Sequence, residues 1–182
     1  MSAGAHLNDA LAAEARAYRA LLARQDAGPA LQAARDAYLH SHAETGPASW
    51  GRLVGALKMA ILAGDGEADI ARRALAEVGE AGTAASAYLR ALAQVTLGEV
   101  PDVTMMLAAG ESFARTGRAL QALGAGDRAA YEAALGEIVA DFEARDEHLS
   151  GVAIADTALV LERLAVPRGM AVHPVSPLVP TA

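Results

Sequence analysis

Glycine and proline interrupt this chain repeatedly, and the segments between them carry apolar residues at helical spacing. An apolar segment ends at each of four clusters: Gly28-Pro29, Gly46-Pro47, Gly64-Asp65-Gly66 and Gly124-Ala125-Gly126. Glycine is common directly after a helix, and proline is common in the first turn of the next one. The pattern therefore predicts a series of helices joined by short connections.

About eight helices are expected, at residues 7–26, 28–43, 50–61, 68–78, 83–97, 100–123, 127–148 and 150–164. The clearest apolar stripe predicts a central helix: Trp50, Leu53, Val54, Leu57 and Ile61. A second stripe follows an expected N-cap at Asp127: Tyr131, Leu135, Ile138 and Phe142. Ser150 is the expected N-cap of the last helix. Gly110 and Gly117 mark kinks or close contacts within the sixth.

Composition favours helices over strands. Aromatic residues make up only 4% of the chain, and alanine supplies much of its 53% hydrophobic content. Alanine is the best helix former, whereas strands prefer aromatic and β-branched residues. Helices joined by short turns pack as antiparallel neighbours. We therefore expect an all-α fold, either an irregular antiparallel bundle or a short αα-hairpin solenoid, forming one domain over residues 1–165.

The C-terminal segment, residues 166–182, has a different character. It holds four of the seven prolines, at positions 167, 174, 177 and 180, so it is not expected to be helical. Apolar residues alternate with these prolines, whereas disordered ends are usually polar. The segment is predicted to be an extended strap packed on the helical domain. The alternative is a recognition peptide for another protein.

Net charge and the termini limit the partners and the location. The formal net charge is −7, which disfavours nucleic-acid binding because that requires clustered lysine and arginine. The first residues lack the basic and apolar parts of a secretory signal, and no apolar run is long enough to span a membrane. The chain has no cysteine, which fits a reducing compartment. A cytoplasmic protein without membrane contact is expected, and its oligomeric state is left open.

No motif predicts a catalytic centre, a cofactor site or a metal site. His40 and His42 lie two residues apart, so on a helix they point in different directions and cannot chelate together. His40 and Glu44 share a face, but two ligands leave a metal site incomplete. The serines at 112, 150 and 176 sit in no nucleophile elbow. The glycines near position 125 follow no strand, which excludes a dinucleotide-binding loop.

The most unusual charge pattern lies in the predicted helix 127–148. Between positions 132 and 147 of this helix, six acidic residues occur with a single base, Arg145: Glu132, Glu137, Asp141, Glu143, Asp146 and Glu147. Several crowd the expected helix C-terminus, where the macrodipole disfavours anions. An ordinary solvated face explains most of these acids. The pattern also suggests a docking surface for a basic protein partner, through electrostatic complementarity.

The C-terminal third resembles a known family in four segments: Asp127-Arg-Ala-Ala-Tyr131, Ile154-Ala-Asp156-Thr-Ala-Leu159, Arg168-Gly169-Met-Ala-Val172 and Ser176-Pro177-Leu-Val-Pro180. These segments are similar to the helical immunity proteins of bacterial polymorphic toxin systems, in particular immunity protein family 49. The resemblance covers about a third of the chain. It implies a bacterial protein that neutralises a cognate toxin by direct binding, with the six acidic residues as the contact surface for a basic toxin.

Two other classes of function remain open. One is a helical adaptor or scaffold that binds a different protein. The other is an enzyme of bacterial secondary metabolism that holds a small molecule in a cavity of the bundle, for which a buried pair of His40 and Glu44 would be a sign. Trp50 is expected in the core rather than in a ligand cage, because it lies on an apolar stripe.

Overall fold

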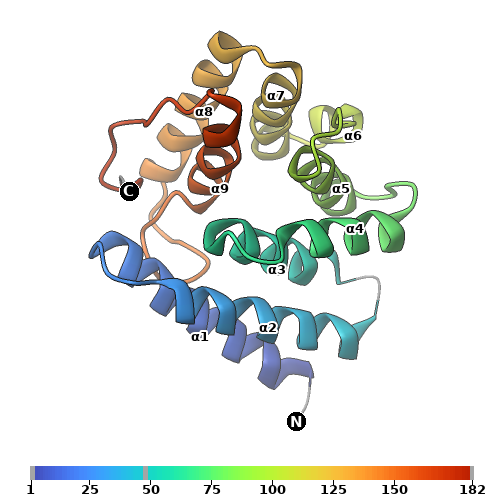
Figure 1. Ribbon diagram of the computed structural model, residues 1–182, viewed down its shortest axis with the longest axis vertical. Helices are drawn as coiled ribbons and strands as arrows, with labels where there is room; N and C mark the ends of the chain where they lie inside the picture. Colours follow the sequence, from blue (N-terminus) through green and yellow to red (C-terminus); the bar gives the residue numbers. More distant parts are fainter. Residues whose placement is uncertain (1–2, 47–48, 181–182) are drawn as a thin grey trace.

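The computed structural model describes residues 3–46 and 49–180, and the regular structure in them is entirely helical (Figure 1). The helices are α1 (Ala3–Leu22), α2 (Gly28–Thr45), α3 (Trp50–Ala63), α4 (Glu67–Val78), α5 (Ala84–Thr96), α6 (Thr104–Ala108), α7 (Glu111–Ala125), α8 (Arg128–Glu143), α9 (Asp156–Ala165) and the short 3-10 helix η1 (Val166–Arg168). The all-α prediction is confirmed. Pro47 and the last two residues of the predicted strap lie outside the described residues.

Helix α3 lies in the middle of the molecule, as its apolar stripe predicted. In Figure 1, α1 and α2 lie side by side at one end, and α7, α8 and α9 lie at the other. Helix α3 contacts α2 on one side and α5 and α9 on the other, so the end of the chain returns to its middle. Leu53, Leu57 and Met59 of α3 are completely buried. No helix in the described part of the chain is both long and apolar enough to cross a bilayer.

A glycine allows α2 to approach α3 closely. A Cβ atom at Gly55 would lie 2.8 Å from ring atoms of Tyr38, which is closer than such contacts allow. The ring of Tyr38 therefore lies directly on the backbone of α3, and its hydroxyl reaches Glu14 on α1. One glycine thus helps to place a polar group next to the centre of the molecule.

Predicted helix boundaries were wrong at three places in the second half of the chain: within residues 100–123, at the end of 127–148 and at the start of 150–164. The helix predicted over 100–123 is interrupted at Gly110, whose φ of +98° is unfavourable for other residues, and this break separates α6 from α7. The helix predicted over 127–148 begins as expected, because Asp127 accepts a hydrogen bond from the Ala130 N–H. It ends at Glu143, however, so Arg145 and the acidic residues after it lie in a connecting segment.

The early end of α8 has a physical reason. Arg145 folds back, donates to Asp141 at 2.5 Å and lies 3.8 Å from the ring centre of Phe142. Continuing the helix would also place more acidic residues at its negative end. Helix α9 begins only at Asp156, so Ser150 is not its N-cap, and Ala155 takes that place without a side-chain hydrogen bond.

The C-terminal segment begins with η1, so the expectation that it contains no helical turn was wrong for Val166–Arg168. Met170 and Val179 are buried. The Ala155 N–H donates to the carbonyl of Leu178 at 2.9 Å. These contacts tie the segment to the start of α9.

Candidate functional site

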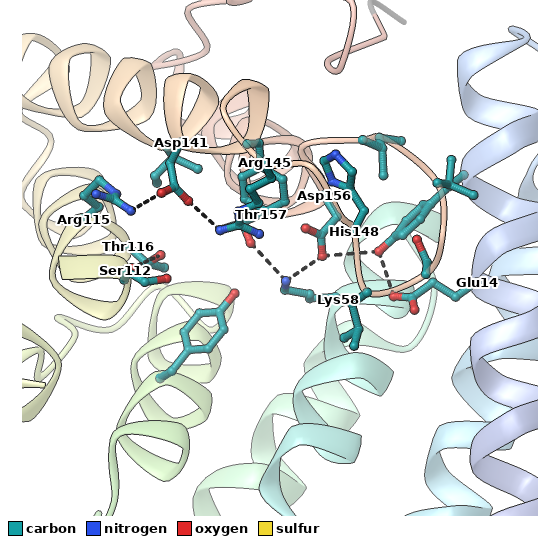
Figure 2. Close-up of a pocket in the computed structure, with 18 of the residues that line it drawn as sticks. Glu14, Lys58, Ser112, Arg115, Thr116, Asp141, Arg145, His148, Asp156 and Thr157 are labelled. Carbon is teal, nitrogen blue, oxygen red and sulfur yellow. Dashed lines mark hydrogen bonds and ion pairs between the residues drawn. The ribbon is translucent and has the colours of Figure 1, made fainter. Parts of the chain in front are cut away.

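A polar cavity of about 230 Å³ opens between α1, α3, α5, α7 and the segment that runs from α8 into α9. Figure 2 shows ten of the polar residues that line it: Glu14, Lys58, Ser112, Arg115, Thr116, Asp141, Arg145, His148, Asp156 and Thr157. Side chains far apart in the sequence therefore converge on one small space. This convergence makes the cavity the candidate site.

A largely buried ion pair lines the cavity. Lys58 comes from the otherwise apolar middle of α3, and its side chain is only 12% exposed. Its Nζ lies 2.7 Å from Oδ2 of Asp156 and 3.1 Å from Oγ1 of Thr157, both in the first turn of α9. Burial is the largest single influence on the pKa of Lys58 and lowers it, but the charge and hydrogen bond of Asp156, together with Tyr88 and Glu14, raise the pKa above its ordinary value. Lys58 is therefore a fixed ammonium, not a nucleophilic amine.

A second carboxylate, Glu14, lies beside this pair. The hydroxyls of Tyr18 and Tyr38 donate to its two oxygens at 2.8 and 2.9 Å, and Tyr18 is also 3.3 Å from Asp156. Glu14 is only 6% exposed, and burial raises its pKa despite the two hydroxyl donors. Burial and the nearby carboxylates raise the pKa of Tyr18 and of Tyr38. Glu14, Asp156 and Lys58 thus form one coupled charged group.

Two polar atoms that line the cavity lack any partner. The hydroxyl of Tyr88 and Nδ1 of His148 are both buried and make no hydrogen bond. Lys58 Nζ lies 5.7 Å from the ring centre of Tyr88. Burial raises the pKa of the Tyr88 hydroxyl, and the proximity of Lys58 and Thr157 partly opposes that rise. Buried polar groups in folded proteins are nearly always hydrogen-bonded. Among the described residues, these two atoms and Nε of Arg90 are the exceptions, and the two that line the cavity require an explanation.

The opposite end of the cavity is built around Asp141. Arg115 of α7 and Arg145 each donate to a different oxygen of this carboxylate. Figure 2 shows Arg115 and Asp141 at one end of the cavity and Glu14 at the other. One carboxylate is therefore shared by two guanidinium groups.

The six acidic residues predicted to bind a partner fall into two groups. Asp141 is held by the two arginines, Glu137 accepts from Arg118 at 2.7 Å, and Glu143 accepts from the Ser176 hydroxyl at 2.6 Å. The remaining three are exposed and form no ion pair among the described residues: Glu132, Asp146 and Glu147. Arg115 and Arg118 of α7 thus neutralise part of the acidic segment, and a charge count along a single helix does not include them.

The histidines of α2 do not form the buried pair with Glu44 that would indicate an enzyme cavity. His40 and Glu44 are exposed and do not form a buried pair. Instead, His42 is 2% exposed, with Nδ1 2.9 Å from the Ser49 hydroxyl and Nε2 2.7 Å from Glu77. In the described part of the chain, no group of three or more His, Asp or Glu residues is placed to hold a metal ion.

Trp50 is only partly buried, at the start of α3, where its ring lies 6.3 Å from that of His42. It packs against the edge of the core, so its expected place in the core is met only in part. It lines no part of the polar cavity.

A third buried carboxylate, Glu162 of α9, has a different environment. It accepts hydrogen bonds from the Tyr131 hydroxyl at 3.0 Å, from the Val172 N–H at 3.2 Å and from the His173 N–H at 2.7 Å. These donors satisfy both oxygens and anchor the C-terminal segment to α9. Glu162 lines no part of the polar cavity.

Sequence reasoning missed the residues at the centre of the site. One signal was present, because Lys58 is the only charged residue between Leu53 and Ala63, the most apolar stretch of the chain. Asp156 and Thr157 lie in one of the four segments that resemble immunity proteins, but nothing local indicated that they pair with Lys58. Comparison with protein-family models, with curated proteins and with solved structures found no match to this chain.

Proposed function

We propose that this protein binds a small, net-neutral polar molecule in the cavity around Lys58. The observation that carries the proposal is the pair of buried, unpartnered atoms that line it, the hydroxyl of Tyr88 and Nδ1 of His148. Leaving a buried polar group unpaired costs about 1–3 kcal/mol. A ligand with hydrogen-bonding groups at both positions removes that penalty when it binds.

The buried ion pair supports the same proposal. Replacing a buried pair by well-packed apolar residues is often neutral or stabilising, so Lys58 and Asp156 are not needed to hold α3 against α9. Charged groups with shifted pKa values in a cavity are more typical of binding sites than of structural cores. The ion pair and Glu14 are therefore interpreted as ligand-binding groups.

Charge and size define the ligand class. Three cations line the cavity, Lys58, Arg115 and Arg145, and three carboxylates balance them, Glu14, Asp141 and Asp156. A ligand with net charge would upset this balance. An engineered apolar cavity of about 150 Å³ holds benzene, so a cavity of about 230 Å³ accommodates a ring with short substituents, on the order of ten heavy atoms.

The test is a panel of net-neutral ring compounds with amide or hydroxyl groups, measured by thermal shift and then by calorimetry. Binding compounds should raise Tm, because a ligand that binds only the folded state stabilises it. Tyr88→Phe should keep or raise stability yet weaken binding about tenfold, the loss of about one hydrogen bond to a buried donor. Equal affinity of the wild type and Tyr88→Phe for every binding compound would refute the role of this cavity.

A second candidate function is toxin neutralisation by direct binding, as in the immunity proteins that the C-terminal third resembles. Three exposed acidic residues without intramolecular ion pairs favour it: Glu132, Asp146 and Glu147. This proposal places the protein in a bacterial cytoplasm. Its scaffold would be an antiparallel helical bundle or solenoid over residues 1–165, with residues 166–182 as a packed strap.

The toxin proposal is tested by co-expression with the product of the neighbouring reading frame. Rescue of growth is expected, and Glu147→Lys together with Asp146→Lys should weaken it. Glu80→Lys, in the turn between α4 and α5, is the matched control. Undiminished rescue by the double variant would exclude this acidic surface as the contact.

A further inference from the structure

The balanced charges of the cavity are not mixed but separated along it. At the end next to α1, two carboxylates and one ammonium lie together: Glu14, Asp156 and Lys58. Their net charge is −1 when all three are ionised. At the end next to α7, Arg115 and Arg145 share the carboxylate of Asp141, so the net charge of these three residues is +1. The cavity is therefore dipolar, and Figure 2 shows Glu14 and Arg115 at its opposite ends.

One neighbouring carboxylate, Glu111, offsets the positive end only in part. Glu111 lies 3.9 Å from Arg115, but its shorter ion pair is to Arg118 at 2.7 Å, and it does not line the cavity. Ser112 and Phe113 line the cavity from the first turn of α7, a helix of 15 residues. The N-terminus of a helix carries partial positive charge, which adds to that of the two arginines.

The negative end is equally well defined. Both oxygens of Glu14 already accept hydrogen bonds from tyrosine hydroxyls, and Asp156 accepts one from Lys58 through Oδ2. One ammonium therefore serves two carboxylates that are coupled through the hydroxyl of Tyr18. A second cationic group would be attracted to this end.

Apolar side chains line the cavity as well: Phe113, Ile138, Phe142, Val152 and Ile154. Four of these residues come from α8 and from the segment that follows it, which also carries His148. They offer an apolar surface for a ring or a chain of methylene groups. A molecule that used both charged ends and these walls would have opposite charges at the two ends of an apolar body.

We propose that the ligand is a zwitterion with separated charges, an ω-amino acid with an aromatic or aliphatic spacer. Its ammonium group lies at Glu14 and Asp156, and its carboxylate lies at Arg115 and Arg145. The hydroxyl of Tyr88 and Nδ1 of His148 line the same cavity and supply further hydrogen-bonding groups to the bound molecule. An α-amino acid does not meet this requirement, because its two charged groups share one carbon atom. This inference rests on the proposed function and names the chemical class of its ligand.

The experiment uses three related probes and calorimetry on the full chain. The zwitterion 4-(aminomethyl)benzoate carries both charges, benzylamine lacks the carboxylate, and 4-methylbenzoate lacks the ammonium. The zwitterion should bind at least about tenfold more tightly than either probe with a single charge, because it gains one more charge-assisted contact. Equal affinity of the zwitterion and benzylamine overturns the proposal, and so does tighter binding of L-phenylalanine.

Two variants test which end of the cavity binds the carboxylate of the ligand and which end binds its ammonium. Arg145→Gln should weaken binding of the zwitterion about tenfold and leave benzylamine unaffected, since only the carboxylate contact is lost. Glu14→Gln should weaken benzylamine and leave 4-methylbenzoate unaffected. Arg72→Gln is the matched control, because Arg72 forms an exposed ion pair with Asp69 on α4. If Arg145→Gln weakens all three probes alike, the assignment of the carboxylate end is wrong.

The same binding measurements distinguish failure of the zwitterion assignment from failure of the proposed ligand site. If uncharged ring compounds bind and depend on Tyr88, whereas the zwitterion does not bind, the cavity is a ligand site and the zwitterion assignment falls. If neither class binds, both fall.

Discussion

Helix α9 carries a buried carboxylate near each end, and the two have opposite surroundings. Asp156, at the start, pairs with a buried side-chain cation beside a cavity in which two polar atoms lack partners. Glu162, near the end, is saturated by one hydroxyl and two backbone N–H groups. A saturated carboxylate holds a segment in place, whereas one beside unsatisfied groups is available to a ligand. Glu162 is therefore interpreted as a structural carboxylate, and Asp156 has the proposed role in binding.

The largest expected effect is at the functional end. Asp156→Ala leaves the Lys58 ammonium buried without its main partner, and breaking a buried pair costs about 3–5 kcal/mol. The free energy of unfolding by urea should fall by about that amount. The double variant Lys58→Met, Asp156→Ala should recover most of it, because no charge is left unpaired.

The exposed pair of Arg72 and Asp69 is the control for this measurement. Its side chains are 63% and 84% exposed, so Asp69→Ala should change the unfolding free energy by less than about 1 kcal/mol. A loss at Asp156 no larger than the loss at Asp69 would mean that Lys58 is not buried against α9 as described.

At the structural end, Glu162→Gln should cost about 1–3 kcal/mol, because one of two accepting oxygens becomes a donor facing N–H groups. The effect should be local. Amide hydrogen exchange at Val172 and His173 should speed up, whereas binding in the polar cavity should not change. A loss of ligand affinity in Glu162→Gln would break the distinction between the two ends of α9.

Local signals predicted the helices well, and their absence explains what was missed. Asp127 and the stripe beginning at Tyr131 defined the start and buried face of α8, because capping and periodicity act within a few residues. The end of α8 depends on Arg145 folding back, which no periodicity encodes. Lys58 and Asp156 are 98 positions apart, so only the tertiary fold reveals that they pair. The same holds for Arg115 and Asp141, whose pairing removes one acid from the predicted docking surface.

His173 offers a smaller change of opposite sign at the structural end. Its φ is +51°, and its side chain is largely exposed, 3.5 Å from Glu162. Residues other than glycine lose about 1–2 kcal/mol in this left-handed conformation. His173→Gly should therefore raise the unfolding free energy by up to about 1 kcal/mol while keeping the N–H that donates to Glu162. A destabilised variant would show that the imidazole contributes more than the strain it imposes.

The smallest expected effect is a change in how stability depends on pH, and it concerns the functional end. Burial raises the pKa of Glu14 above its ordinary value, so its ionisation is harder in the folded chain than in the unfolded one. The stabilising contribution of Glu14 is fully present below its unfolded pKa and is lost as pH rises through the folded pKa. The wild type should thus lose stability relative to Glu14→Gln as pH rises above about 4, the unfolded pKa of a glutamate.

Urea unfolding of both proteins across this range measures the difference directly. Parallel curves would mean that the hydroxyls of Tyr18 and Tyr38 fully offset the burial of Glu14. Glu14 would then belong with the structural carboxylates. Diverging curves place it with Asp156, because a carboxylate that destabilises the unliganded fold is retained for what it binds.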